Sequence, residues 1–300
     1  MINLRTMALI TLSVLAVGAG GASGCRAQSP APPGEKPSEN RPASQDNDRR
    51  AIEIKGLAEG FHSRVNDPFL AVVRDADTYA ELGEWAGDLP SLGSDFFKSN
   101  AVVAAFLGQR NTGGYSVQIT RGGNGEVRID EKKPGKGVMV TQMITAPFKV
   151  VSVSLDSVSP VLLSLDSPWR QKLQTYRVTR GTFTMSGGFA GSTERFALEG
   201  EMRLMREANF VTVAFQMLSS GLEKRRSLVG VETGTVGPKG EVTMRRMSAD
   251  SLVNSPSSGL KATGSFVDRR LLLTFASLPS YVADGYSGMG TVEAELTNPV

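Results

Sequence analysis

The chain has 300 residues, a formal net charge of +3, and 33 basic against 30 acidic residues. Its basic pairs, such as Arg245-Arg246 and Arg269-Arg270, stand at expected hairpin ends, so we exclude nucleic acid as a partner. Aromatic residues make up only 7% of the chain, whereas 33 glycines accompany short runs rich in Val, Thr and Ser. This composition predicts a mainly β or α+β protein of about two domains.

The first segment has the order of a secretory signal peptide over residues 1–24. A single arginine precedes an apolar stretch at 7–17, and small residues follow it. The chain has one cysteine, Cys25, which excludes an intramolecular disulfide and stands at the end of this leader. Residues 22–25, Ala-Ser-Gly-Cys, resemble a bacterial lipobox, which implies acylation of Cys25. Ordinary cleavage after Ala27 is the alternative, and a buried free cysteine fits its Gly, Ser and Arg neighbours poorly.

The leader is followed by a tether. Residues 26–50 are rich in Pro, Ser, Glu, Asn and Asp and contain neither aromatic nor β-branched residues, so they cannot build a core. By analogy with lipoprotein sorting, Arg26 in place of an acidic residue favours the outer membrane over the inner membrane. We therefore expect a lipid-anchored protein of the bacterial cell envelope, with its folded part in the periplasm or exposed at the surface.

A first, α+β domain with one short helix and an antiparallel sheet is expected over residues 51–156. Asp75 is the expected N-cap of the helix, whose apolar stripe of Tyr79, Leu82 and Trp85 precedes a stop at Gly87. Alternating or continuous apolar residues predict the strands of the sheet. These strands are expected near Ile52 and over 69–73, 101–107, 115–120, 127–129, 138–144 and 150–155.

The stretch Gly-Gln-Arg-Asn-Thr-Gly-Gly-Tyr at 108–115 turns the chain between two of these strands. Two adjacent glycines suit a tight turn with positive φ. Tyr115 shares the parity of Val117 and Ile119, so its ring is expected to face the core. We expect a structural turn first, with Asn111 and Thr112 at its tip as the strongest contact candidates. The full set of partner-binding candidates is Asn111, Thr112, Gly113, Gly114 and Tyr115.

An all-β second domain is expected over residues 157–300. Inward and outward residues alternate clearly, as in Val211, Val213, Phe215 and Met217, and hairpin turns separate the runs. About eight antiparallel strands in hairpin order imply an up-and-down barrel or a sandwich. Lipocalin-like binding of a small apolar ligand inside such a barrel stays open, although side chains more often fill small barrels.

No constellation typical of catalysis, and no cofactor or metal site, is found in the sequence. His62 is the one histidine, the Gly-x-Ser-x-Gly pattern is absent, and Glu199 with Glu201 fits a solvated strand face better than acid/base catalysis. Met202 with Met205, and Met244 with Met247, resemble copper ligands in spacing. Residues three apart on a strand point to opposite faces, which favours core filling instead. We expect a non-enzyme.

Residues 95–155 resemble the C-terminal domain of the PrcB family, bacterial surface lipoproteins associated with a protease complex. The likeness rests on four stretches, and with the preceding helix it extends over residues 51–156. The resemblance implies a non-catalytic, lipid-anchored accessory subunit that supports an exported protease; it does not reach the second domain. The four stretches are Asp95-Phe96, Phe106-Leu107-Gly108, Thr112-Gly113-Gly114-Tyr115-Ser116-Val117 and Thr145-Ala146-Pro147.

A second resemblance leads to an alternative function. Residues 111–115, Asn-Thr-Gly-Gly-Tyr, partly resemble the wedge loop of chagasin-type cysteine-protease inhibitors, and Pro168-Trp169 faintly resembles their third loop. The Pro-Thr pair of the inhibitor loop is absent, and the companion glycine loop is not found. Protease inhibition through the Asn111–Tyr115 loop therefore stays the alternative to an accessory role.

Overall fold

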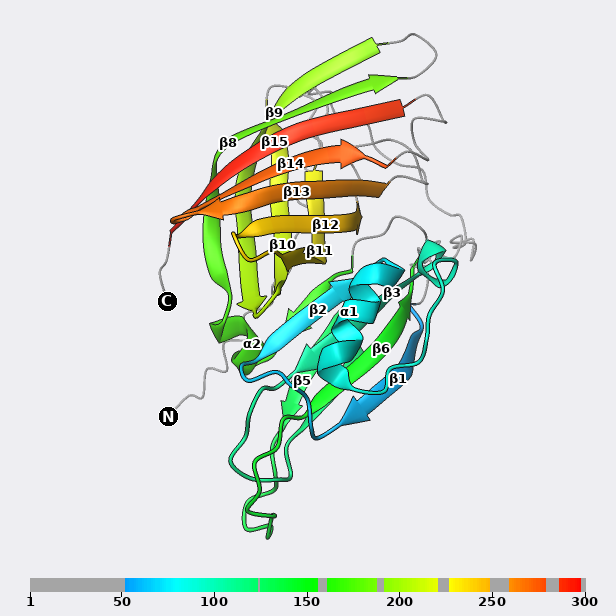
Figure 1. Ribbon diagram of the computed structural model, residues 1–300, viewed down its shortest axis with the longest axis vertical. Helices are drawn as coiled ribbons and strands as arrows, with labels where there is room; N and C mark the ends of the chain where they lie inside the picture. Colours follow the sequence, from blue (N-terminus) through cyan, green and yellow to red (C-terminus); the bar gives the residue numbers. More distant parts are fainter. Residues whose placement is uncertain are drawn as a thin grey trace, which may run out of the picture.

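The computed structural model describes residues 52–123, 125–155, 161–187, 192–220, 227–248, 259–278 and 286–297. A mixed N-terminal region lies against a closed barrel, which is uppermost in Figure 1. The predicted signal peptide, Cys25 and the tether lie outside the described residues. Among the helices that the structure describes, none has the length and hydropathy needed to cross a membrane.

The N-terminal region contains two sheets. The larger has the antiparallel order β1-β6-β3-β2, and the smaller has the order β4-β5-β7, with β7 parallel to β5. The α+β class with an antiparallel sheet is confirmed, although the parallel β7 was not expected. The strands are β1 (Ile54–Gly60), β2 (Phe69–Val73), β3 (Asn100–Phe106), β4 (Ser116–Arg121), β5 (Val127–Lys132), β6 (Phe148–Ser154) and β7 (Leu163–Leu165).

Helix α1 (Ala76–Ala86) forms where its capping signals predicted it. The side chain of Asp75 accepts a hydrogen bond from the Thr78 backbone N–H, and Gly87 ends the helix at φ 74°. Tyr79 and Leu82 are buried, as the apolar stripe indicated. A short 3₁₀ helix, η1 (Phe96–Lys98), and a second helix, α2 (Ser167–Gln171), were not expected from the sequence.

The strand expected at 138–144 is wrong. These residues belong to the long loop between β5 and β6, and four of their apolar side chains are exposed. The run is mostly apolar, as in a strand, but Pro134, Gly135 and Gly137 precede it and Pro147 follows it. Gly137 has φ 80°, so the chain turns before a strand ladder can form.

The second region is a closed, eight-stranded up-and-down barrel, which decides between the barrel and the sandwich. Each strand pairs with the next one in the chain, and β15 pairs with β8 to close the ring. Two-residue hairpins at Ala208-Asn209 and Asp268-Arg269 place Ala208 and Asp268 at positive φ. The strands are β8 (Gln174–Gly187), β9 (Ser192–Glu207), β10 (Phe210–Ser220), β11 (Ser227–Val236), β12 (Glu241–Ser248), β13 (Gly259–Val267), β14 (Arg270–Ser277) and β15 (Tyr286–Leu296).

The barrel covers the edge of the N-terminal sheet at β2. The backbone N–H of Val72 donates to Thr233 Oγ1 at 2.7 Å, and the Thr212 hydroxyl donates to the Leu70 carbonyl. Strand edges carry unpaired backbone groups that invite association with other chains. Two threonine hydroxyls from β10 and β11 therefore satisfy backbone groups at an edge that would otherwise be open.

Candidate partner-binding surface

The turn at 108–115 connects β3 to β4 and depends on two of its glycines. Gly108 has φ 71°, and a Cβ atom at this position would lie 2.5 Å from the backbone oxygen of Asn66. Gly114 has φ 83° and faces the side chains of Pro134 and Val140. A side chain at either position would be strained, so the glycines serve the backbone path of the turn.

The turn is hydrogen-bonded to the long β5–β6 loop. Arg110 and Thr145 exchange backbone hydrogen bonds of 2.7 and 2.9 Å, and the Gly113 N–H donates to the Thr141 carbonyl at 2.9 Å. The Thr145 hydroxyl also donates to the Thr112 carbonyl at 3.1 Å. The two loops therefore form one surface at the end of the N-terminal region.

Tyr115 contributes to the structure of this surface. Its half-buried ring packs against the N-terminal core, and the Arg110 guanidinium lies 5.7 Å from the ring centroid. Arg110 also pairs with the nearly buried carboxylate of Glu131 at 3.0 Å. Asn111 is exposed, whereas Thr112 is half-buried. Of the sequence-predicted contact residues, Asn111 is thus the side chain most open to a partner, and contact through any of the five stays a prediction.

The most exposed apolar side chains of this region lie beside the turn. Met139 is 97% exposed. Phe61 directly follows strand β1, and its backbone carbonyl accepts a hydrogen bond from the Ala146 N–H of the loop at 2.7 Å. We call the set the apolar loop surface; each member is more than half exposed, and the members are Phe61, Val138, Met139, Met143 and Ile144. Several exposed apolar side chains on two hydrogen-bonded segments are a candidate for an interaction site.

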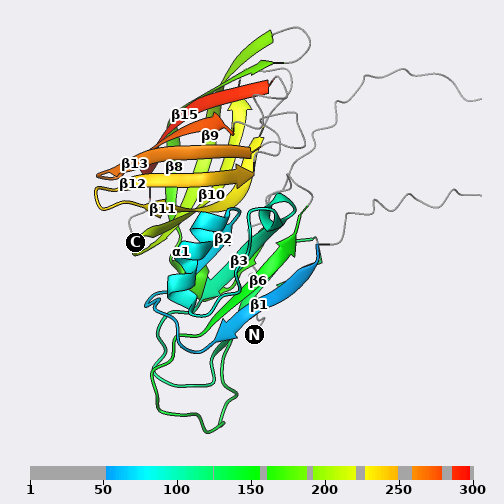
Figure 2. The same cartoon turned by 45° about the vertical axis from the view of Figure 1, so that its right-hand side comes forward.

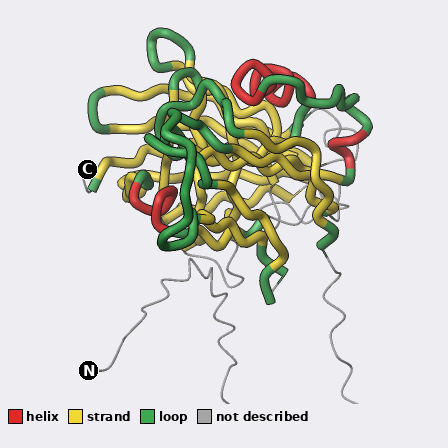
Figure 3. The backbone as a smooth tube through the Cα atoms, turned by 90° about the horizontal axis from the view of Figure 1, so that it is seen from below, coloured by secondary structure: helices red, strands yellow, loops and turns green. Residues whose placement is uncertain are grey.

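The β5–β6 loop extends to the lower end of the molecule, away from the barrel (Figures 1 and 2). In the view from below, loops cross in front of the strands (Figure 3). Sequence reasoning missed this surface because it interpreted 138–144 as a strand. The glycines and prolines on both sides of the run were the signal that could have identified a loop.

The remaining candidates from the sequence are dispersed. His62 is exposed and forms a β-bridge with Ala146, and the residues that the structure describes contain no group of three or more His, Cys, Asp or Glu placed to hold a metal ion. Trp169 is fully buried, with Nε1 donating to the carbonyls of Phe69 and Phe106 at 3.1 and 2.9 Å. Its ring is therefore not at the surface, where the inhibitor resemblance would require it.

The methionine pairs lie in the protein cores. Met202 points into the barrel core, whereas Met205 packs with the N-terminal core, as expected for residues three apart on a strand. Met244 and Met247 instead share the barrel core, because a register shift in β12 lies between them. The opposite-face argument was therefore wrong for the second pair, although both residues are buried as core filling predicts.

One comparison with known proteins matches the segment that contains the 108–115 turn and the β5–β6 loop. Residues 101–154 match the family model described as PrcB C-terminal. The PrcB C-terminal segment covers β3, the 108–115 turn, β4, β5, the apolar loop and β6, which confirms the resemblance expected over 95–155. No curated protein and no solved structure matches the chain.

Proposed function

We propose that this protein is a non-catalytic accessory subunit that binds an exported protease complex through the apolar loop surface. The observation that carries the proposal is the exposure of Met139 and its apolar neighbours within the PrcB C-terminal segment. Apolar residues at the centre of an interface supply much of its binding energy. Asn111 lies in the turn that is hydrogen-bonded to this loop and would contribute a polar contact at its margin.

Affinity capture from a detergent extract of the source cells tests the proposal. The full-length protein should retain a protease subunit, identified by mass spectrometry, and the double variant Met139→Asp/Ile144→Asp should lose it, because charged groups at an apolar interface must be desolvated. Met289→Asp is the matched control, since Met289 is 66% exposed but lies on the barrel strand β15. Equal capture by the wild type and the double variant would contradict the proposed surface.

The accessory role and the inhibitor alternative predict different effects on protease activity. An accessory subunit should leave the proteolytic activity of the captured complex intact or raise it. An inhibitor acting through 111–115 should instead slow a papain-like protease, and Asn111→Ala or Tyr115→Ala should relieve the inhibition. Inhibition with that variant profile would replace the accessory role.

We further propose that Cys25 carries the lipid that holds the protein at the cell envelope. The composition of residues 26–50 supports this, because a tether of about twenty-five residues can span several nanometres when extended. Metabolic labelling with a palmitate analogue should mark the wild-type protein and not the Cys25→Ser variant. Labelling that survives this substitution would show that the lipid is attached elsewhere and would contradict the proposed role of Cys25.

A further inference from the structure

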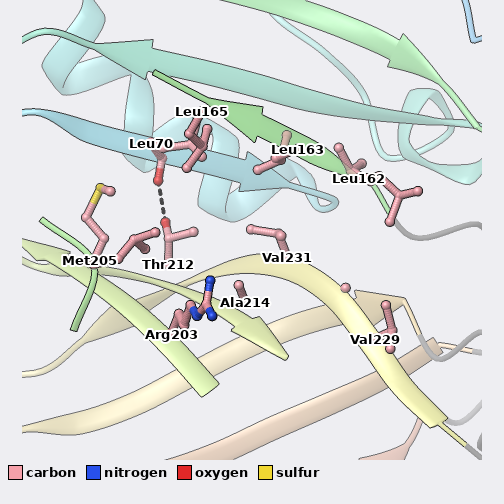
Figure 4. Close-up of a pocket in the computed structure, with 13 residues that line it drawn as sticks. Leu70, Leu162, Leu163, Leu165, Arg203, Met205, Thr212, Ala214, Val229 and Val231 are labelled. Carbon is pink, nitrogen blue, oxygen red and sulfur yellow. Dashed lines mark hydrogen bonds between the residues drawn. The ribbon is translucent and has the colours of Figure 1, made fainter. Parts of the chain in front are cut away.

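An apolar crevice opens between the N-terminal region and the outer surface of the barrel. About 580 Å³ of space lies between its walls when the part open to solvent is included, and about 40 Å³ of this can hold the centre of a water-sized molecule. Figure 4 shows leucines of the N-terminal region, among them Leu70 and Leu163, facing Met205, Thr212 and Val231 of the barrel wall. The residues that line it are Leu70, Val161, Leu162, Leu163, Leu165, Leu173, Arg203, Met205, Thr212, Ala214, Val229, Gly230 and Val231.

The crevice is separate from the barrel interior. On β10, Val213 and Phe215 belong to the barrel core, whereas Thr212 and Ala214 have the opposite parity and line the crevice. A ligand in the crevice would therefore contact the outside of the barrel wall. This distinguishes it from the lipocalin-like ligand considered in the sequence analysis, which would occupy the interior.

The lining combines aliphatic walls with one cationic side chain. The hydroxyl of Thr212 is already engaged with the Leu70 carbonyl and with Thr233 Oγ1. Arg203 is half-buried, and its neighbours across the ladder are Thr175 and Ala214, which carry no charge. Within the described part of the chain, no acidic side chain lies within ion-pair distance of its guanidinium. Glu201, two residues earlier on the same face, lies opposite Arg177.

We propose that this crevice binds a single-chain amphiphile with an anionic head group. Its hydrocarbon chain would lie between the leucines and the β9–β11 wall, and a carboxylate or phosphate would pair with Arg203. A guanidinium forms strong, paired hydrogen bonds with both head groups. The arrangement matches the usual pattern of small-molecule sites, in which apolar walls surround a few polar groups that fix orientation.

Calorimetric titration of the full-length protein tests the site, with dodecanoate and dodecyl phosphate as separate probes below their micelle concentrations. At least one should bind with 1:1 stoichiometry, and their relative affinities identify the preferred head group. Dodecyltrimethylammonium, which has the same chain and a cationic head, should bind at least tenfold more weakly. Arg203→Gln should weaken binding of the anionic probe by at least tenfold, because a charge-assisted contact is lost.

Two pairs of variants locate the bound chain. Ala214→Trp fills the crevice and should abolish binding. Gln216→Trp is its control, because Gln216 is on the same strand and face but outside the lining, and this variant should still bind. If Ala214→Trp fails to fold, Val229→Phe takes its place. Arg177→Gln is the charge control for Arg203→Gln, since Arg177 is exposed on the adjacent strand β8. Circular dichroism checks the fold of each variant.

Three results would overturn the proposal. One is the absence of saturable binding of either anionic probe. Another is unchanged binding in Arg203→Gln and in the filled variant, which would place the ligand elsewhere, including the barrel interior. The third is a dimer, detected by sedimentation, that is lost on filling the crevice, because a second copy of the chain would then be its occupant.

Discussion

Arg74 and Glu232 connect the two regions through an ion pair that is almost fully removed from solvent. Arg74 Nε lies 2.9 Å from both carboxylate oxygens of Glu232, and the two side chains are only 7% and 1% exposed. The N–H and hydroxyl of Ser248 also donate to Glu232, at 2.8 and 2.7 Å. Burial raises the pKa of the Glu232 carboxyl, while the Arg74 charge and the Ser248 hydrogen bonds oppose the rise.

Breaking this pair from one side should cost more than removing both charges. Arg74→Met leaves the Glu232 charge buried without its guanidinium, and a loss of about 3–5 kcal/mol in unfolding free energy is expected. The double variant Arg74→Met/Glu232→Gln removes both charges and keeps an acceptor for Ser248, so its stability should lie closer to that of the wild type. Denaturant unfolding at pH 7 measures the unfolding free energy of the wild type, of Arg74→Met, of Glu232→Gln and of the double variant. If the loss in the double variant equals the sum of the losses in the two single variants, the two side chains are not energetically coupled.

The pH dependence of the same variants has a definite sign. The folded-state pKa of Glu232 is raised above its ordinary value of 4.5. Its contribution to stability is therefore fully present below pH 4.5 and is lost as the pH rises through the folded-state pKa. The unfolding free energy of the wild type minus that of the double variant should fall as the pH is raised from 4.5. A flat difference would show that the pKa of the carboxyl is not shifted by folding, and an increase would show that it is lowered.

At the scale of elements, the sequence predicted best where local signals and packing agree. Helix α1 has both a cap at Asp75 and a stop at Gly87, and β10 alternates because one face lines the barrel core. Barrel closure follows from the pairing of β8 with β15, which no local pattern encodes; the sandwich therefore stayed open. Helix α2 has five residues, too short to show a period.

The candidate surface illustrates the opposite case. Residues 138–144 are mostly apolar and include β-branched residues, as strands do. A strand also needs a neighbour with free backbone groups, and in the larger sheet β6 already pairs with β1 and β3. The run is left as an exposed loop held by Arg110–Thr145 and Gly113–Thr141 hydrogen bonds. The turn at 111–115 was located correctly from its glycines. The apolar loop surface could not be predicted from the sequence, because the exposure of a side chain depends on which neighbours the whole fold provides.

At the scale of the whole molecule, the two regions share one core. The buried cluster of the N-terminal sheet includes Met205, Phe210 and Val231 from the barrel. The ring of Phe210 lies 4.5 Å from that of Trp85 in an edge-to-face arrangement, and Arg245 pairs with Glu81 on α1 at 2.8 Å. Two domains that merely touched would be expected to have a smaller and more polar interface.

The shared core predicts a single unfolding transition for both regions. Both tryptophans, Trp85 and Trp169, precede the barrel, so their fluorescence reports on the N-terminal region, whereas far-UV circular dichroism mainly reports on the longer barrel strands. The two signals should change at one denaturant midpoint. Phe210→Ala should lower both midpoints by the same amount, because it opens a cavity where the two regions meet. The unfolding free energy should fall by about 3–5 kcal/mol.

Phe275→Ala provides the matched comparison, because Phe275 is equally buried but lies in the barrel core. If both regions unfold in one transition, Phe275→Ala lowers the unfolding free energy of the whole molecule. The midpoint measured by tryptophan fluorescence should then fall, even though the substitution lies outside the N-terminal core. If Phe275→Ala shifts only the circular dichroism transition, the barrel unfolds on its own. The threonine contacts at β2 and the ion pair of Arg74, the residue after β2, would then hold two independent domains together without coupling their stability.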